Sequence, residues 1–419
     1  TVFMSFYTMI DGLFVSNLLG TDALSAINLS APIISLVTAV STMLATGGSA
    51  VIMKKAGEGK IEEARRDFTF LILVNIGVGI VMSLLGFALM DKIFAGMGLS
   101  QKVFDYCHAY LSHYLLFTVP ILLMNNFTLY MIASGRSTLS MLCSITGGVL
   151  NILLDPIFIF GLDLGISGAA IATLLSQCVS ASILASFFLR GQSEIRVSIR
   201  CVSTAPKIYL TIFKSGMPSF FRQGMASVSA MALNFNAGVY GDAAVAAMAI
   251  VTKVFNFLLS AVIGFGQGMQ PVVGYNYGAK ELGRVRQAVS FSLKFCTVIL
   301  TVAAAAGAVF APQIVQFFRN DPAVVAVGTQ AFRFQCISLP LAAVLVFANM
   351  LFQSLGKSWR ASLLALCRQG MFFIPLVYLL PMHFGLLGLE VTQMCSDLIA
   401  FLVSAAFLLH YFRREFDRV

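Results

Sequence analysis

The chain has 419 residues, of which 58% are hydrophobic and 11% are charged, and its mean hydropathy is +0.89. A soluble domain has too little interior to bury so much apolar surface, whereas a lipid bilayer accepts it, so the composition excludes a soluble enzyme or binding module. The formal net charge is +9. No basic stretch is interleaved with aromatic residues, so this charge indicates membrane topology and no nucleic-acid partner.

Twelve stretches are predicted to be transmembrane helices, because a helix needs about 20 mostly apolar residues to cross the hydrocarbon core. In chain order they cover residues 1–19, 24–53, 68–90, 104–134, 138–161, 166–190, 206–238, 243–274, 287–317, 323–355, 359–380 and 385–411. Each half of the chain contributes six of them. The first stretch begins inside an apolar run, so we expect the first helix to be cut short at its start.

The second half of the chain repeats the first, since a shift of 221 residues places residues 20–140 on residues 241–361 without a gap. The identical pairs include Gly20 and Gly241, Gly47 and Gly268, Arg65 and Arg286, and, at a shift of 220, Gly165 and Gly385 with Gly168 and Gly388. Two homologous halves in a membrane are the usual build of a secondary transporter. We therefore predict an all-α membrane protein of two pseudo-symmetric six-helix bundles, residues 1–190 and 206–419, joined by a cytoplasmic linker at 191–205.

The lysines and arginines predict the orientation of the chain in the membrane. Most of them fall at one set of alternate loops and at the C-terminus, and the other set of loops holds only Lys92, Lys102, Arg319 and Arg333. By the positive-inside bias the richer set is cytoplasmic. We therefore expect a multi-pass protein of the cell inner membrane with both termini in the cytoplasm.

Three aspartates lie inside predicted spans, Asp11, Asp155 and Asp397. A charged carboxylate at the centre of a span costs about 2.5–3.5 kcal/mol on insertion scales, so each of the three is a functional candidate. Asn151 precedes Asp155 by four residues, which puts the amide and the carboxylate on one face of a helix. Asp11 and Asp155 belong to the same half, and two such acids can share a proton or a monovalent cation.

Two of these aspartates also have structural explanations. Asp155 and Pro156 are compatible with a helix end, where the aspartate caps and the proline ends the hydrogen-bond ladder. Asp397 can pair with Lys253 or with Arg368, which also lie inside spans, or it can bind substrate. The sequence leaves these alternatives open.

Amides and cations inside spans are candidates for lining a substrate pathway, since they avoid hydrocarbon. Together with Asp397, the substrate-binding candidates are Arg222, Gln223, Asn234, Lys253, Asn256 and Gln353. The 37 Phe and 19 Met residues suit flat lipophilic cations, although most of them must face lipid. The eight cysteines form no CxxC pair and the four histidines have no ligand spacing, so we expect no cofactor and no cysteine or histidine metal centre.

Three segments resemble the multidrug and toxic compound extrusion (MATE) family, and the resemblance covers the whole chain. They are DGLFVSNLLGTDALSA at the end of the first span, PVVGYNYGAKELGRVRQAV after the eighth, and NILLDPIFIFGLDLGISGAAIAT across the fifth and sixth. The resemblance implies two bundles around a central cavity and a proton or sodium site in the first bundle. The residues that match this site are Asp11, Asn151, Asp155 and Thr173.

Some members of the family are expected to use a second cation site, with acids on the seventh and tenth spans. Residues 206–238 and 323–355 of this chain contain no Asp or Glu. This absence favours the first bundle as the place of coupling.

The resemblance implies a secondary transporter and not an enzyme: an antiporter that uses H⁺ or Na⁺ to export lipophilic, often cationic drugs or toxins by alternating access. It would work among membrane lipids as a monomer, since one chain holds both halves. The alternative is a flippase for a lipid-linked oligosaccharide or another lipid precursor, which would need a cluster of cations for a pyrophosphate. A membrane-embedded enzyme is disfavoured, because the chain has neither a His-Glu-x-x-His motif nor a nucleophile with its base.

Overall fold

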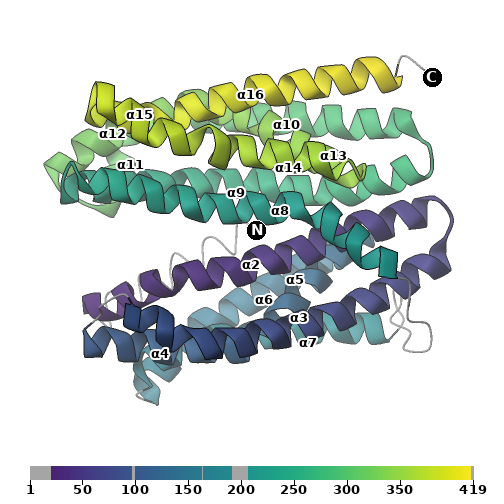
Figure 1. Cartoon of the computed structure of the whole chain (residues 1–419), viewed down its shortest axis with the longest axis horizontal. Coiled ribbons are helices and arrows are strands. Elements are labelled where there is room, and N and C mark those ends of the chain that lie inside the picture. Colours follow the sequence, from purple (N-terminus) through teal and green to yellow (C-terminus); the bar gives the residue numbers. More distant parts are fainter. Residues whose placement is uncertain (1–19, 97–99, 163, 191–205, 417–419) are drawn as a thin grey trace. The chain divides into compact units, whose positions relative to one another are not determined.

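The computed structural model of the chain describes residues 20–96, 100–162, 164–190 and 206–416. Every regular element within these ranges is a helix, as Figure 1 shows. The chain forms two compact units, Thr1–Gly216 and Met217–Val419, and the division falls inside the long helix α8 (Pro206–Gly238). The predicted linker at 191–205 lies outside the described residues, so the domain boundaries drawn from the sequence stay a prediction.

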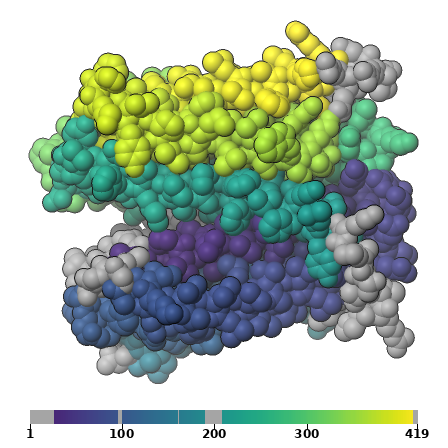
Figure 2. Space-filling view, in the orientation of Figure 1, coloured from purple at the N-terminus to yellow at the C-terminus, as the bar shows by residue number. Residues whose placement is uncertain are grey.

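The first unit is built around contacts of α2 and α7. Its helices are α2 (Gly20–Gly57), α3 (Ile61–Gly96), α4 (Gln101–Leu116), α5 (Thr118–Ala133), α6 (Ser137–Pro156), the π-helical η1 (Ile157–Gly161) and α7 (Gly165–Leu189), followed by the first part of α8. Helix α2 packs against α3, α4 and α5, while α7 packs against α4, α5 and α6. Figure 2 shows side chains filling the space between neighbouring helices of each unit.

The second unit has α13 in its core. After the last part of α8, its helices are α9 (Asp242–Gly278), α10 (Leu282–Val309), α11 (Ala311–Phe318), α12 (Pro322–Ser338), η2 (Leu339–Leu341), α13 (Ala342–Ser354), α14 (Ser358–Leu366), the π-helical η3 (Cys367–Met371), α15 (Phe373–Phe384) and α16 (Leu386–Phe416). Phe347, Ala348 and Leu351 of α13 are fully buried. Helix α13 packs against α9, α10, α14 and α16, so it joins the helices of this unit together.

The repeat predicted from the sequence recurs in the backbone. Gly135 and Gly356 follow α5 and α13 with φ of 77° and 74°, and Gly165 and Gly385 stand at the starts of α7 and α16 with φ of 54° and 59°. A side chain is disfavoured in this left-handed region, which explains the glycines. Equivalent positions of the two halves therefore make the same turns.

The helices of the described part include nine that are long and apolar enough to cross a membrane, and the number is ten when α4 and α5, a pair bent by 54°, are counted as one span. On α3, Val81, Leu84 and Leu85 leave more than half of their surface exposed, as expected of a lipid-facing side. The chain is therefore a multi-pass membrane protein.

Two of the twelve predicted spans are not among these ten. The stretch 1–19 lies outside the described residues. The stretch 206–238 forms helix α8 as predicted, but it is not among the helices apolar enough to count as a span. Lys214, Arg222 and several Ser, Gln and Asn residues lower its hydropathy.

Candidate cation-coupling site

Asn151 and Asp155 lie on the buried face of α6, which also carries Gly147 and Gly148 one turn earlier. The helical path does not stop at Pro156, because Pro156 has φ −62° and ψ −35° and the chain runs on into η1. A proline has no N–H for the helix ladder, and a wider turn follows it here. Asp155 therefore lies inside a continuous helical segment, which contradicts the helix-end explanation.

The structure brings three of the four predicted coupling residues together. Asn151 Nδ2 donates to Asp155 Oδ1 at 3.3 Å and to Thr173 Oγ1 at 3.1 Å. Thr173 Oγ1 in turn donates to the Ala169 carbonyl at 3.1 Å. Asn151 and Asp155 are fully buried. The fourth residue, Asp11, lies outside the described residues.

Helix α7 reaches the site because a glycine lets it approach the preceding segment closely. A Cβ atom at Gly168 would lie 2.7 Å from the carbonyl carbon of Phe158 in η1, closer than real Cβ atoms come to backbone. Gly168 lies five residues before Thr173 on the same helix. The close approach therefore sets how near Thr173 comes to the face of α6.

The cluster offers only oxygen donors to a cation: a carboxylate, an amide oxygen and a hydroxyl. Asn151 Oδ1 is buried and accepts no hydrogen bond from the described residues. Oxygen donors of this kind suit a proton or a hard monovalent cation. No group of three or more His, Cys, Asp or Glu residues gathers within the described part of the chain.

Comparison with known proteins decides the family. The MatE family model matches residues 1–157 and 218–379, which is most of the chain. This chain belongs to the MatE family. The family is one of ion-coupled membrane transporters, so the protein is a transporter and not an enzyme.

Relatives of this MatE protein match over nearly their whole length. It is 26% identical to multidrug export protein MepA of Staphylococcus haemolyticus (strain JCSC1435), over 95% of this chain and 88% of the relative. It is also 26% identical to MepA of Staphylococcus aureus (strain NCTC 8325 / PS 47), over 99% of this chain and 91% of the relative.

Solved structures show that the fold is the MATE fold. A crystal structure of MATE in complex with MaL6 gives a TM-score of 0.92 at 24% identity and covers 98% of this chain and 92% of that one. The outward-facing conformation of a multidrug resistance MATE family transporter gives the same TM-score, identity and coverage. The all-α fold expected from the sequence is thereby confirmed.

In the second unit of this MatE protein, Asp397 forms an ion pair with Arg368. Arg368 Nε donates to Asp397 Oδ1 at 2.8 Å, and Gln393 Nε2 donates to the same oxygen at 3.0 Å. Ser338 Oγ donates to Asp397 Oδ2 at 3.3 Å. Of the two cations that the sequence offered, Arg368 is the partner, while Lys253 is exposed on α9. Because Asp397 is fully buried, this geometry favours the ion-pair explanation over contact with substrate.

Sequence reasoning missed Gln393 and Ser338 as partners of Asp397. Gln393 carried a signal, because it stands four residues before Asp397 and so shares its helix face. Ser338 carried none, since it comes from another helix. Only the packing of α12 against α16 brings it near.

Gln353, another substrate-binding candidate, belongs to an internal hydrogen-bond network. Gln270 Nε2 donates to Gln353 Oε1 at 2.9 Å, and Gln353 Nε2 donates to Ser219 Oγ at 3.0 Å. Gln353 is fully buried, so the network accounts for its amide. Of the remaining candidates, Arg222 and Gln223 are half-buried. Asn234, Lys253 and Asn256 are exposed. Their role in substrate binding stays a prediction.

Asp67 on α3 is a buried acid that the sequence placed near a span end. It is 1% exposed, and Lys55 Nζ of α2 lies 2.6 Å from its Oδ2. Glu63 Oε2 lies 3.2 Å from the same nitrogen. This ion pair links the end of α2 to the start of α3, which gives the burial of Asp67 a structural explanation.

Proposed function

We propose that this protein is a cation-coupled antiporter that exports lipophilic, often cationic drugs or toxins across the cytoplasmic membrane by alternating access. One observation carries the proposal: Asp155 is fully buried between membrane helices and hydrogen-bonded to Asn151, which also binds Thr173. The names of the relatives, multidrug export proteins, support drugs as the exported substrates. The coupling cation is H⁺ or Na⁺.

The buried carboxylate supplies the coupling. A carboxylate away from water is costly as an anion, so it binds a proton or a monovalent cation readily. Asp11 of the first span adds a second acid, and two neighbouring acids favour the uptake of one proton between them. Neutralisation changes the packing of the first, fifth and sixth spans. A cationic drug held by the same charge then loses affinity and leaves.

Vesicle transport tests the proposal. Purified protein in vesicles is given a fluorescent cationic dye and either a pH gradient or a sodium gradient, and the rate of dye efflux is measured. The gradient that drives efflux identifies the cation. We expect Asp155→Asn and Asp11→Asn each to abolish coupled efflux, because the amide can neither bind a proton nor neutralise a cation.

The matched control is Asp91→Asn. Asp91 lies at the end of α3, where its side chain is 62% exposed and its Oδ1 is 3.5 Å from His108 Nε2. The same change of chemistry outside the site should leave efflux at the wild-type rate. Wild-type efflux by Asp155→Asn would contradict the proposal.

A flippase for a lipid-linked oligosaccharide is the alternative. It would need a cluster of free cations for a pyrophosphate. Of Arg222, Lys253 and Arg368, Arg368 is engaged with Asp397, which leaves two. The melting temperature of the protein tests this alternative. A rise in melting temperature with an anionic lipid precursor, but not with a cationic dye, would favour the flippase.

The positive-inside bias supports an inner-membrane protein with both termini in the cytoplasm. Both repeats lie in one chain, so a monomer is sufficient for transport.

A further inference from the structure

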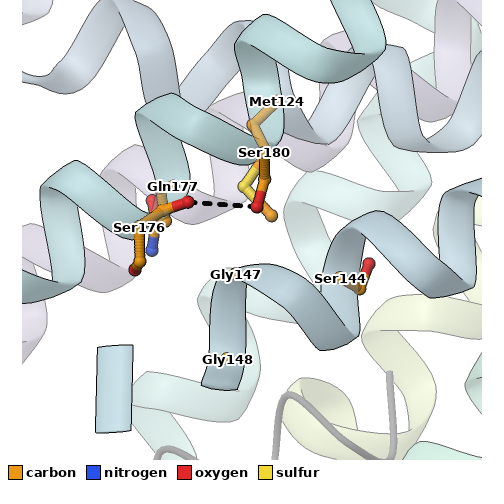
Figure 3. A pocket seen from close by; sticks show the side chains of 7 residues that line it. All are labelled: Met124, Ser144, Gly147, Gly148, Ser176, Gln177 and Ser180. Atoms are coloured by element: carbon orange, nitrogen blue, oxygen red, sulfur yellow. Dashed lines mark hydrogen bonds between the residues drawn. The ribbon is translucent and has the colours of Figure 1, made fainter. Parts of the chain in front are cut away.

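A small cavity lies between α5, α6 and α7, and its polar lining side chains are three serines and a glutamine (Figure 3). Its lining includes Met124, Ser144, Gly147, Ser176, Gln177 and Ser180. It has room for about one water molecule. Gly147 comes one helical turn before Asn151, which is about 6 Å along the axis of α6. The cavity therefore lies nearer than Asn151 to the N-terminal end of α6.

The cavity presents acceptors. Ser144 Oγ donates to the Ser140 carbonyl at 2.9 Å and Ser176 Oγ to the Thr173 carbonyl at 2.7 Å. Ser180 Oγ donates to the Ser176 carbonyl at 3.0 Å, the hydrogen bond drawn in Figure 3. These hydroxyl protons point at the backbone, so the lone pairs of the oxygens remain for a ligand.

The side-chain amide of Gln177 has an oxygen that lacks a hydrogen-bond donor among the described residues. This oxygen, Oε1, is buried. A buried acceptor without a donor is destabilising, so a donor is expected there. An acceptor-lined space of this size takes one water molecule, and it disfavours an anion.

In the second repeat, the positions that correspond to Gly147 and Gln177 are occupied by two charged side chains. A shift of 221 pairs Gly147 with Arg368, and a shift of 220 pairs Gln177 with Asp397. In the second unit Arg368 and Asp397 meet at 2.8 Å, between the segments that correspond to α6 and α7. Where the second repeat has an ion pair, the first has a glycine and an amide, which leave a polar gap.

We propose that this cavity holds a water molecule, and that this water relays the coupling proton between Asp155 and the starting end of α6. The proposal rests on the proposed function, since it needs Asp155 to be the coupling acid. Ser176 Oγ donates to the backbone carbonyl of Thr173, and the Thr173 hydroxyl accepts from Asn151, so Thr173 has polar contacts both with the cavity and with the candidate site. The loop before α6 contains Arg136 and is cytoplasmic by the positive-inside bias, so this path is the cytoplasmic one.

Radiolytic footprinting of the full chain in nanodiscs tests for the water directly. X-ray pulses turn bound water into hydroxyl radicals, which oxidise a neighbouring methionine to its sulfoxide. Met124 lines the cavity and is 6% exposed, while Met131 on the same helix is fully buried outside it. We expect Met124 to be oxidised much faster than Met131, and Gln177→Leu to remove most of that difference. Equal, slow oxidation of both methionines would overturn the proposal.

Measurements of transport test whether the water relays the coupling proton. Ser144→Val and Gln177→Leu fill the cavity with apolar groups, and they should slow gradient-driven dye efflux by about tenfold, as expected when an ordered water on the path is lost. Dye binding in the absence of a gradient should be unchanged. The matched control is Ser182→Val, the same substitution on the exposed side of α7, which should transport at the wild-type rate.

The outcomes separate the two proposals. If Asp155→Asn is inactive while Ser144→Val and Gln177→Leu both match Ser182→Val, the water path is wrong and the coupling site stands. If Asp155→Asn is active, the proposed function fails, and the water path fails with it. Should Ser144→Val not yield protein that binds dye, Gln177→Leu decides by itself.

Discussion

At the scale of single residues, Asn151 holds the candidate site together, because one amide nitrogen binds both Asp155 and Thr173. Asn151→Leu keeps the branched shape of the side chain and removes both hydrogen bonds. A hydrogen bond to a charged group contributes about 1.5–3 kcal/mol, so we expect coupled dye efflux in vesicles to fall by about tenfold or more. Thr173→Val removes only one of the bonds and should cost less. Equal losses in the two variants would contradict this role of Asn151.

The ion pair of Arg368 and Asp397 makes a prediction about stability. Arg368→Met leaves Asp397 buried without its cation, which costs about 3–5 kcal/mol. The double variant with Asp397→Leu removes the stranded charge as well and should recover most of the loss. Thermal unfolding in detergent measures both. If the double variant were no more stable than Arg368→Met, the two side chains would not form an ion pair in the folded protein.

At the scale of elements, α7 and α16 each carry in their first turn a glycine that approaches the preceding backbone closely. A Cβ atom at Gly168 would lie 2.7 Å from the Phe158 carbonyl carbon, and one at Gly388 would overlap the Leu380 carbonyl oxygen. Because backbone cannot move aside easily, Gly168→Ala and Gly388→Ala should each destabilise the protein by about 1–3 kcal/mol.

The matched control for these helix contacts is Gly77→Ala on α3, where a Cβ atom would meet nothing within 4 Å. There the alanine should be neutral or stabilise the helix by up to about 1 kcal/mol. The melting temperatures of the three variants, measured side by side, test the assignment. If Gly77→Ala were the least stable, close packing at the helix starts would not explain the glycines.

At the scale of the whole molecule, the repeat and the charge pattern predict the same orientation for both halves. Cysteine labelling tests this orientation, with one cysteine introduced at a time. Lys60 and Glu281, which the shift of 221 makes equivalent, represent one side of the membrane, and Ser100 and Asn320 represent the other. In a variant without the native cysteines, an impermeant maleimide added to intact cells should label only Ser100→Cys and Asn320→Cys. Labelling of Lys60→Cys or Glu281→Cys before the membrane is permeabilised would reverse the topology.

Much of the fold follows from local properties of the sequence. Composition predicts the membrane, because the sum of apolar side chains does not depend on how they pack. Runs of apolar residues predict the helices, and identical glycines at fixed shifts predict the repeat that Gly135 and Gly356 show in their φ angles. The four-residue spacing of Asn151 and Asp155 predicts a shared face, since helix geometry alone decides it.

Other features depend on which helix faces meet, and residues far apart in the chain decide that. The sequence offered Asp397 two cations, and the packing of η3 against α16 selects Arg368. The continuation of the helix past Pro156 depends on η1 forming a wider turn. The cavity beside Gln177 exists only because α5, α6 and α7 converge there. Helical periodicity lies within a single segment and can be read from it, whereas burial and pairing are properties of contacts between segments, which only the tertiary structure establishes.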